Sequence, residues 1–313
     1  MNKDKLVIIA GPTAVGKTDT SIELAKRING EIISADSMQV YKYMDIGSAK
    51  ISKAEMGGIT HHLIDVLEPQ DDFNVALFKE LAKNAINEIQ RKGKIPIIVG
   101  GTGFYIQSVL YDIDFTKENT NADYRKELEG LAKEKGEVYL HNMLKETDPD
   151  AAAEIHPNNT KRVIRALEYF YLTGEKISVH NRRERAKKSP YDYCYFVLND
   201  ERENLYKRID ERVDKMLEAG LVDEVKKLKD MGLDRSFVSM QGLGYKEILS
   251  FLDEEITLDE AVYLIKRDTR HFAKRQLTWF RREGECIWIE KNKFDYDINK
   301  ITDYMIERIE KSE

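Results

Sequence analysis

The stretch GPTAVGKT, residues 11–18, decides the fold of this chain. It is a complete GxxxxGK[ST] motif that follows an apolar run over residues 5–10 and precedes residues 18–29, whose apolar positions have helical spacing. Glycines allow backbone N–H groups to surround a phosphate, and the N-terminus of the next helix adds partial positive charge. The motif in this context therefore predicts a phosphate-binding loop. Its expected members are Gly11, Pro12, Thr13, Ala14, Val15, Gly16, Lys17 and Thr18.

The last two residues of the motif carry its chemistry. Lys17 can place a full positive charge on the outermost phosphate, and the hydroxyl of Thr18 can hold Mg²⁺. The motif thus indicates a bound di- or triphosphate with Mg²⁺ as the cofactor, but it does not specify a reaction.

The segments around the motif have the order of an α/β fold. Residues 31–36 (EIISAD) and 95–99 are two further apolar runs of strand length, and an amphipathic helical pattern over residues 75–92 separates them. The second run leads into the glycine-rich turn over residues 100–103. This β-α-β-α-β order predicts a parallel sheet flanked by helices, as in P-loop NTPases.

The composition changes between residues 115 and 193, where Glu, Lys, Asn and Ala dominate and strand-like runs vanish. Helical periods appear instead, so we predict a helical insertion domain over residues 115–193 within a catalytic core formed by residues 1–114 and 194–313. A strand is expected at residues 193–198, and a long helix over residues 257–282.

The overall composition excludes several classes of protein. The longest apolar runs, residues 6–10 and 95–99, span five residues, whereas a membrane helix needs roughly 18. Cys194 and Cys286 stand far apart without a CxxC pair, which argues against a disulfide framework or a zinc site. We therefore expect a cytoplasmic protein with no signal peptide and no membrane contact.

An acidic residue ends the second predicted strand. Asp36 stands where the carboxyl end of a parallel strand faces the crevice in which ligands bind. It could act as a general base or ligate the metal, and the spacing leaves both roles open. Ser37, Met38, Gln39 and Tyr41 follow it and form a polar and aromatic set that suits a planar polar substrate.

Several long motifs follow one another along nearly the whole chain. They are GPTAVGKT (11–18), DSMQVYKYMDIGSAK (36–50), HHLID (61–65), GGTGFY (100–105), IHPNNTKRVIRALE (155–168), residues 202–225, QGLGYKE (241–247) and TRHFAKRQLTWFR (269–281). In this order they resemble the tRNA dimethylallyltransferase family. With only two cysteines the chain has no counterpart of the C-terminal zinc finger of the eukaryotic relatives, so the resemblance implies the bacterial form.

This resemblance implies transfer of a dimethylallyl group from dimethylallyl diphosphate to the exocyclic amine of the adenine 3′-adjacent to the anticodon, with release of diphosphate. Lys17 and Mg²⁺ on Thr18 would then stabilise the leaving diphosphate, and Asp36 would accept the proton of the amine. Thr102 is implied as a third catalytic residue, which hydrogen-bonds near that amine. Arg212 is expected as a second cation on the diphosphate, although Arg208 lies one helical turn away.

The net charge of −6 argues against a nucleic-acid partner, but the local charge does not. Residues 156–190 and 266–282 each carry a net charge of +6, and Arg267, Arg270, Lys274 and Arg281 would form one basic stripe on a helix. A solvated helix face is the alternative interpretation. The expected contacts with the tRNA anticodon stem-loop are Asp36, Ser37, Met38, Gln39, Thr102, Arg125, Lys161, Arg162, Arg165, Arg270, Lys274 and Arg275.

Aromatic residues in the two basic segments have two interpretations. His180, Trp279 and Phe280 could stack on RNA bases, but aromatic side chains at helical spacing more often belong to a core. We expect a monomer.

Three other functions remain possible from the residues alone. An adenylate isopentenyltransferase would use a free adenine nucleotide, which needs neither basic segment nor the helical insertion. A small-molecule kinase would need catalytic arginines near the phosphate loop, and a non-catalytic RNA-binding module would leave that loop and Asp36 without a role.

Overall fold

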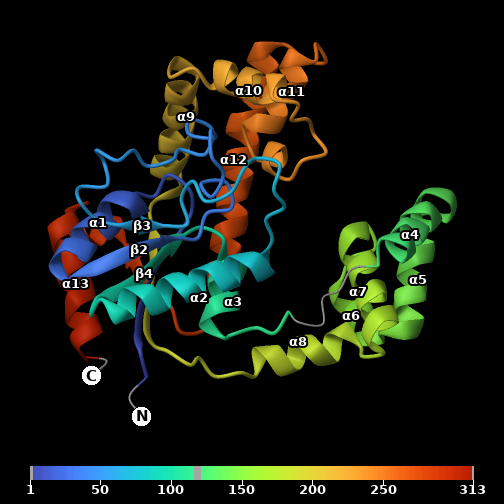
Figure 1. Cartoon of the computed structure of the whole chain (residues 1–313), viewed down its shortest axis with the longest axis horizontal. Helices are drawn as coiled ribbons and strands as arrows, with labels where there is room; N and C mark the ends of the chain where they lie inside the picture. Colours follow the sequence, from blue (N-terminus) through green and yellow to red (C-terminus); the bar gives the residue numbers. More distant parts are fainter. Residues whose placement is uncertain (1–2, 116–120, 312–313) are drawn as a thin grey trace. The chain divides into compact units, whose positions relative to one another are not determined.

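The computed structural model describes residues 3–115 and 121–311. The chain divides into two compact units, one formed by Met1–Leu110 with Pro190–Glu313 and the other by Tyr111–Ser189 (Figure 1). The boundaries expected from the sequence, at residues 115 and 193, each lie four residues further along the chain. Residues 116–120, which belong to the expected insertion, lie outside the described residues.

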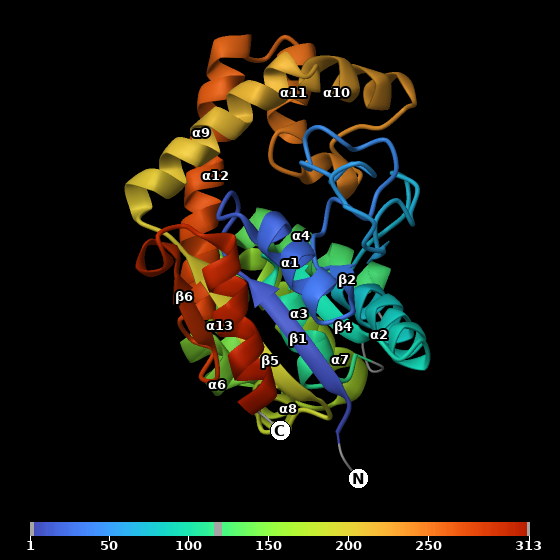
Figure 2. The same cartoon turned by 90° about the vertical axis from the view of Figure 1, so that its left-hand side faces the viewer.

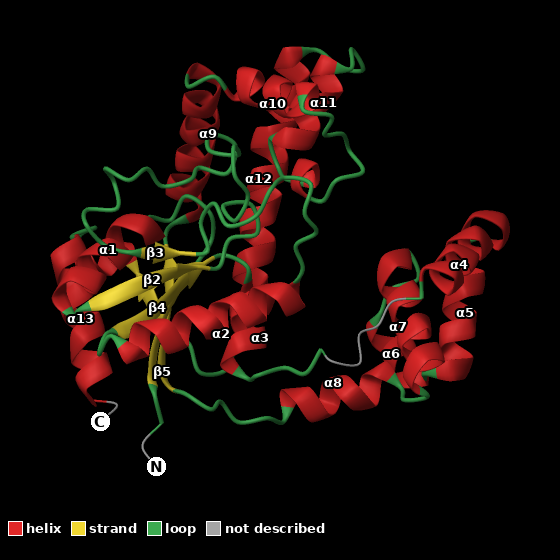
Figure 3. Cartoon of the chain, viewed as in Figure 1, coloured by secondary structure: helices red, strands yellow, loops and turns green. Residues whose placement is uncertain are grey.

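The first unit contains a six-stranded sheet in which every pair of neighbours is parallel (Figure 3). This arrangement confirms the predicted α/β class with a P-loop NTPase-like sheet. The two outer strands β3 and β6 were not predicted, because runs of two and four residues show no periodicity. In spatial order the strands are β3 (His61–His62), β2 (Gly30–Ser34), β4 (Ile95–Gly100), β1 (Lys5–Ala10), β5 (Asp192–Asn199) and β6 (Ile287–Glu290).

Helices cover both faces of this sheet (Figure 2). The connection from β1 to β2 and the connection from β2 to β4 cross the sheet in opposite directions, so right-handed crossovers place their helices on opposite faces. Helix α1 packs against α13, and α2 packs against α3. The bounds are Lys17–Arg27 for α1, Val75–Arg91 for α2, Gly103–Leu110 for α3 and Ile298–Lys311 for α13.

The core of the unit lies around the central strands. Val7 and Ile9 of β1, Ile97 of β4, and Phe196 and Leu198 of β5 are at most 2% exposed. Strands that are covered on both faces have continuous apolar sequences, and this explains the runs KLVIIA and IPIIVG.

A group of four helices extends beyond the carboxyl ends of the strands (Figure 2). The longest, α12 (Leu258–Phe280), confirms the helix predicted near residues 257–282, and the Thr257 hydroxyl caps it by accepting a 3.2 Å hydrogen bond from the Glu260 N–H. The others are α9 (Arg202–Glu218), α10 (Leu221–Asp230) and α11 (Tyr245–Leu252), and single turns of 3₁₀-helix occur at Ser239–Gln241 and Lys291–Phe294.

The second unit is entirely helical in its described part. Leu128, Leu140, Leu144 and Val163 are fully buried and form its own small core. Across the described residues of both units, no helix is long and apolar enough to cross a membrane. The helices are α4 (Ala122–Lys135), α5 (Glu137–Thr147), α6 (Pro149–Glu154), α7 (Thr160–Thr173) and α8 (Ile177–Arg185).

A buried carboxylate in β2 is held by three basic side chains. The Glu31 side chain is 3% exposed and lies 2.8 Å from Lys94 Nζ, 2.8 Å from His62 Nε2 and 3.1 Å from Lys92 Nζ. Burial alone would raise the pKa of Glu31, but the hydrogen bonds from Lys94, His62 and Lys92 outweigh it and lower the pKa to about 2. The charged form therefore stabilises the fold.

We expect Glu31→Gln to lower the free energy of unfolding at pH 7 by about 2 to 3 kcal/mol, because it leaves three basic groups without their carboxylate. The folded pKa of Glu31 lies below the unfolded value of 4.5, so this stabilisation is complete at neutral pH and is lost as the pH falls toward 2. Urea denaturation of both proteins between pH 7 and pH 3 should show the difference shrinking with acidity. A constant difference would contradict this account.

Candidate active site

The loop between β1 and α1 has the conformation of a phosphate cradle. Ala14 and Gly16 have positive φ angles of 63° and 92°, which turn successive backbone N–H groups toward one side. The Lys17 ammonium donates to the carbonyls of Gly11, at 3.0 Å, and Pro12, at 2.8 Å. The loop thus keeps its lysine folded against its own backbone, beside the N-terminus of α1.

Two partly buried basic side chains, Lys17 and Arg212, interact electrostatically at this loop. Burial and the charge of Arg212 lower the pKa of Lys17 to about 7, against the opposing effect of Asp36. Burial also lowers the pKa of Arg212, whose Nη1 lies 3.3 Å from the hydroxyl of Thr13. Two cations that repel each other in a desolvated place are suited to a bound anion, because an anion relieves both the repulsion and the burial penalty.

The structure distinguishes Arg212 from its neighbour Arg208. Arg208 forms a 2.8 Å ion pair with Asp200, whose side chain is fully buried, and its guanidinium lies 5.8 Å from the ring centre of Tyr296. Within the described part of the chain, Arg212 forms no ion pair, and its hydrogen-bond partner is Thr13. Arg212 is therefore the arginine available to a ligand.

Asp36 lies in a small pocket at the carboxyl ends of β2 and β4. The Ala35 N–H donates to the Val99 carbonyl at 2.8 Å, so sheet pairing continues to the residue before Asp36. Asp36 Oδ1 accepts hydrogen bonds from the N–H groups of Met38 at 2.8 Å and Gln39 at 3.4 Å. The pocket is lined by Lys17, Thr18, Ser21, Ile32, Ser34, Asp36, Gln39, Ile51, His61, Ile64, Val99 and Gly100.

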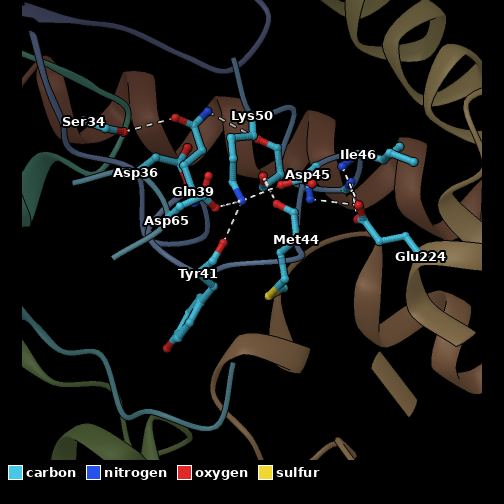
Figure 4. Close-up of polar contacts among 12 residues, drawn as sticks. Ser34, Asp36, Gln39, Tyr41, Met44, Asp45, Ile46, Lys50, Asp65 and Glu224 are labelled. Carbon is cyan, nitrogen blue, oxygen red and sulfur yellow. Dashed lines mark hydrogen bonds and ion pairs between the residues drawn. The ribbon is translucent and has the colours of Figure 1, made fainter. Parts of the chain in front are cut away.

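The Gln39 side chain is directed into its own loop (Figure 4). Its Oε1 accepts from the Ser34 hydroxyl at 3.1 Å, and its Nε2 donates to the carbonyls of Ser48 at 3.4 Å and Ala49 at 3.3 Å. From the sequence, this amide is expected to contact tRNA. In the structure the amide is already hydrogen-bonded at both ends, so it holds the loop together.

A glutamine of α12 connects the phosphate loop to the glycine-rich turn. Gln276 Oε1 accepts from the Thr13 N–H at 2.9 Å, and its Nε2 donates to the Gly101 carbonyl at 3.1 Å. A Cβ at Gly101 would lie 2.0 Å from this Nε2, so only glycine allows the approach. The next residue, Thr102, directly precedes α3, and its carbonyl accepts from the N–H groups of Tyr105 and Ile106.

Sequence reasoning gave Gln276 no role, although it lies within the motif TRHFAKRQLTWFR. Its contact with Gly101 joins residues 175 positions apart, and no local pattern in the sequence indicates it.

The basic stripe expected on α12 is interrupted. Arg267 pairs with Asp268 at 2.8 Å, and Arg270 pairs with Asp210 of α9 at 2.5 Å, so these two charges are largely neutralised. Lys274 and Arg275, one turn further, are exposed and have no acidic partner among residues 3–115 and 121–311. A charge count along the sequence could not include Asp210, because this acid belongs to another helix. Contact of the stripe with tRNA stays a prediction.

The basic residues of the second unit also differ in their availability. Arg125 lies 2.6 Å and Arg165 3.8 Å from the buried carboxylate of Glu168, so both are bound within the unit. Lys161 and Arg162, at the start of α7, are exposed, and no described acidic group pairs with them.

The aromatic residues lie mainly in cores. Phe280 is fully buried, and His180 is 7% exposed with its ring centre 5.2 Å from that of Tyr169. Trp279 packs against Phe104, with their ring centres 6.1 Å apart. Burial favours the core interpretation for Phe280 and His180, whereas Trp279 is partly buried against the exposed Phe104.

The parallel sheet and the GxxxxGK[ST] loop after its β1 strand define a protein with a P-loop NTPase-like fold. The family model of the IPP transferases matches residues 39–283. The chain therefore belongs to the IPP transferase family, which confirms the family predicted from the sequence motifs.

Relatives with high identity agree with this assignment. The chain is 64% identical over 298 residues to a tRNA dimethylallyltransferase of Lachnoclostridium phytofermentans, covering 95% of each chain. It is 48% identical to the solved tRNA isopentenylpyrophosphate transferase of Bacillus halodurans, with a TM-score of 0.75 and coverage of 99% and 98%. A solved eukaryotic dimethylallyltransferase acting on tRNA is 33% identical with a TM-score of 0.79, covering 92% of this chain and 74% of that chain.

The lowered pKa of Lys17 predicts that anion binding is coupled to proton uptake. At pH 8 a lysine with a pKa of about 7 is mostly neutral, and a bound diphosphate favours its charged form. We expect the unaltered protein to take up about 0.9 proton more than Lys17→Arg when each binds methyl diphosphate at pH 8, because the guanidinium of the variant is already charged. Calorimetric titrations in two buffers of different ionisation enthalpy measure this difference, and equal proton numbers would refute the assignment.

Proposed function

We propose that this protein transfers a dimethylallyl group from dimethylallyl diphosphate to the exocyclic amine of the adenine 3′-adjacent to the anticodon in tRNA, and releases diphosphate. The observation that carries the proposal is the combination of the cation pair Lys17 and Arg212 with the carboxylate of Asp36. The cations suit a diphosphate leaving group, and the carboxylate suits an amine that must lose a proton. The names of the closely related proteins support the same reaction.

On the donor side, positive charge would stabilise the departing diphosphate. Lys17, Arg212 and the N–H groups of the loop would surround the diphosphate, on which negative charge grows as the allylic C–O bond breaks. Gln276 keeps the loop against the glycine-rich turn, so these donors need little rearrangement during the reaction.

On the acceptor side, the amine needs a group that orients it and accepts its proton. The lone pair of an adenine amine is delocalised into the ring, which makes it a weak nucleophile. As the C–N bond forms, Asp36 would take the proton through Oδ2, since Oδ1 is hydrogen-bonded to the loop amides. Thr102, which directly follows Gly101, would hydrogen-bond near the reacting amine.

The donor set fits a Mg²⁺ ion that is bound mainly by the substrate. Across the described residues, no group of three or more His, Cys, Asp or Glu side chains could hold a metal. Mg²⁺ commonly keeps several waters and binds through phosphate oxygens and few protein ligands. The Thr18 hydroxyl, which lines the pocket, would be that protein ligand, and the bound ion would neutralise charge on the diphosphate.

We further infer that the enzyme acts as a monomer in the cytoplasm, where its tRNA substrate is found. The exposed cations Lys161, Arg162, Lys274 and Arg275 support contacts with RNA phosphates.

The identity of the labelled acceptor distinguishes the proposed reaction from the alternative reactions. We expect purified protein, Mg²⁺ and labelled dimethylallyl diphosphate to label unmodified tRNA with adenine at the position 3′ of the anticodon. AMP at the same concentration should stay unlabelled, because a free nucleotide cannot use the exposed cations. Labelled AMP without labelled tRNA would overturn the proposal, and so would consumption of ATP with phosphorylation of a small acceptor.

We expect Asp36→Asn to lower the single-turnover rate of transfer to tRNA by at least about 100-fold, because the amide cannot accept the proton. The asparagine oxygen can still accept the loop N–H groups, so the loop should keep its shape. Binding of methyl diphosphate should be unchanged or tighter, since a negative charge near Lys17 and Arg212 is removed. Weaker diphosphate binding in the presence of Mg²⁺ would instead indicate that Asp36 is a metal ligand.

A further inference from the structure

The loop over residues 36–50, here called the acceptor loop, is held in place by a carboxylate of helix α10 (Figure 4). Glu224 of α10 accepts three hydrogen bonds from consecutive backbone N–H groups, those of Asp45 at 2.8 Å, Ile46 at 2.7 Å and Gly47 at 3.0 Å. Successive N–H groups that converge in this way form an anion-binding nest. In this protein a side chain of the same chain fills the nest.

The Glu224 carboxylate is largely shielded from solvent, and a second buried side chain donates to it. Glu224 is 9% exposed, and its Oε1 also accepts from the hydroxyl of the fully buried Tyr245, at 2.8 Å. Burial and the neighbouring Glu224 raise the pKa of Tyr245 well above its ordinary value, so the phenol remains a donor. A Cβ at Gly47 would lie 2.5 Å from the Tyr245 ring, so the loop backbone packs directly on that ring.

The acceptor loop needs such external support. Tyr43 and Ala49 have φ angles of 64° and 48°, a left-handed conformation that costs non-glycine residues on the order of 1 kcal/mol or more. Lys50, whose side chain is 4% exposed, contributes from within the loop by donating to the Tyr41 carbonyl at 2.7 Å and to Asp45 Oδ1 at 2.6 Å. Glu224 provides the link to the helices outside the loop.

Hydrogen bonds connect the nest to the general base. Residues 48 and 49 follow the nest directly, and their carbonyls accept from Gln39 Nε2. The Gln39 N–H in turn donates to Asp36 Oδ1, which also accepts from the Met38 N–H. A shift of the nest would therefore move the residues that begin the acceptor loop.

We propose that Glu224 is a positioning residue for the acceptor adenine: it fixes the acceptor loop so that Asp36 meets the reacting amine. This inference rests on the proposed function, because it assigns the loop to the adenine and not to the diphosphate. No hydrogen bond or ion pair in the described residues joins Glu224 to Lys17 or Arg212. The effect of changing Glu224 should therefore fall on the acceptor and not on the donor.

The test is Glu224→Gln, which keeps the shape of the side chain but turns an NH₂ group toward N–H donors. We expect kcat/KM for tRNA to fall by about 10- to 100-fold, with part of the loss in kcat, because small displacements of reacting groups are costly. The Kd of methyl diphosphate should stay within about twofold, which also reports that the protein is folded. Asp223→Asn is the matched control, because it removes the same charge from the exposed neighbouring position, and it should change neither value.

A second variant tests the nest itself. Glu224→Ala leaves the three N–H groups without an acceptor. Added acetate or formate should therefore raise the kcat/KM of this variant for tRNA at least about tenfold, and the increase should saturate with anion concentration. The same salts should not stimulate the unaltered protein or Asp223→Asn.

Three results would overturn the proposal. They are unchanged kcat/KM for tRNA in Glu224→Gln, an equal loss of methyl diphosphate affinity in that variant, or no restoration of Glu224→Ala by either anion. Failure of the proposed function is a separate outcome, since the unaltered protein would then not transfer the dimethylallyl group to tRNA.

Discussion

The repulsion between two partly buried basic groups is the constraint on which the rest of this structure depends. Lys17 and Arg212 interact unfavourably, and neither forms an ion pair with any residue that the structure describes, an arrangement that opposes folding unless an anion is bound. Other interactions of the fold offset this repulsion. They include the two carbonyls that accept from the Lys17 ammonium and the packing of the sheet whose strand β5 leads into α9. Such a local conflict is expected where a protein is built for a ligand.

Most of the fold could be predicted from the sequence because its signals are local. The strand β1 and the helix α2 were predicted to within one residue, since continuous apolar runs and helical spacing report burial directly. The strands β3 and β6 were missed, because such short segments become strands only through their neighbours β2 and β5. Propensity carries too little information at that length.

The residues of the site fall into the same two groups, those that local sequence signals place and those that only tertiary contacts bring together. Lys17, Thr18 and Asp36 could be placed from the sequence, because each stands at the end of a predicted strand or the start of a predicted helix. The contacts of Gln276 with the phosphate loop and of Glu224 with the acceptor loop could not, because they join residues more than 170 positions apart. The neutralisation of Arg270 by Asp210 belongs to the same group, since only packing of α9 on α12 brings them together.

The hydrogen bonds at Asp36 have a consequence for the substrate. Because Oδ1 is bound to two N–H groups of its own loop, the carboxylate cannot rotate freely, and Oδ2 has a fixed direction. The rotational entropy of this carboxylate is therefore lost during folding and not during the reaction. In the proposed reaction the acceptor amine would then have to approach Oδ2 from the one direction that the acceptor loop leaves to it.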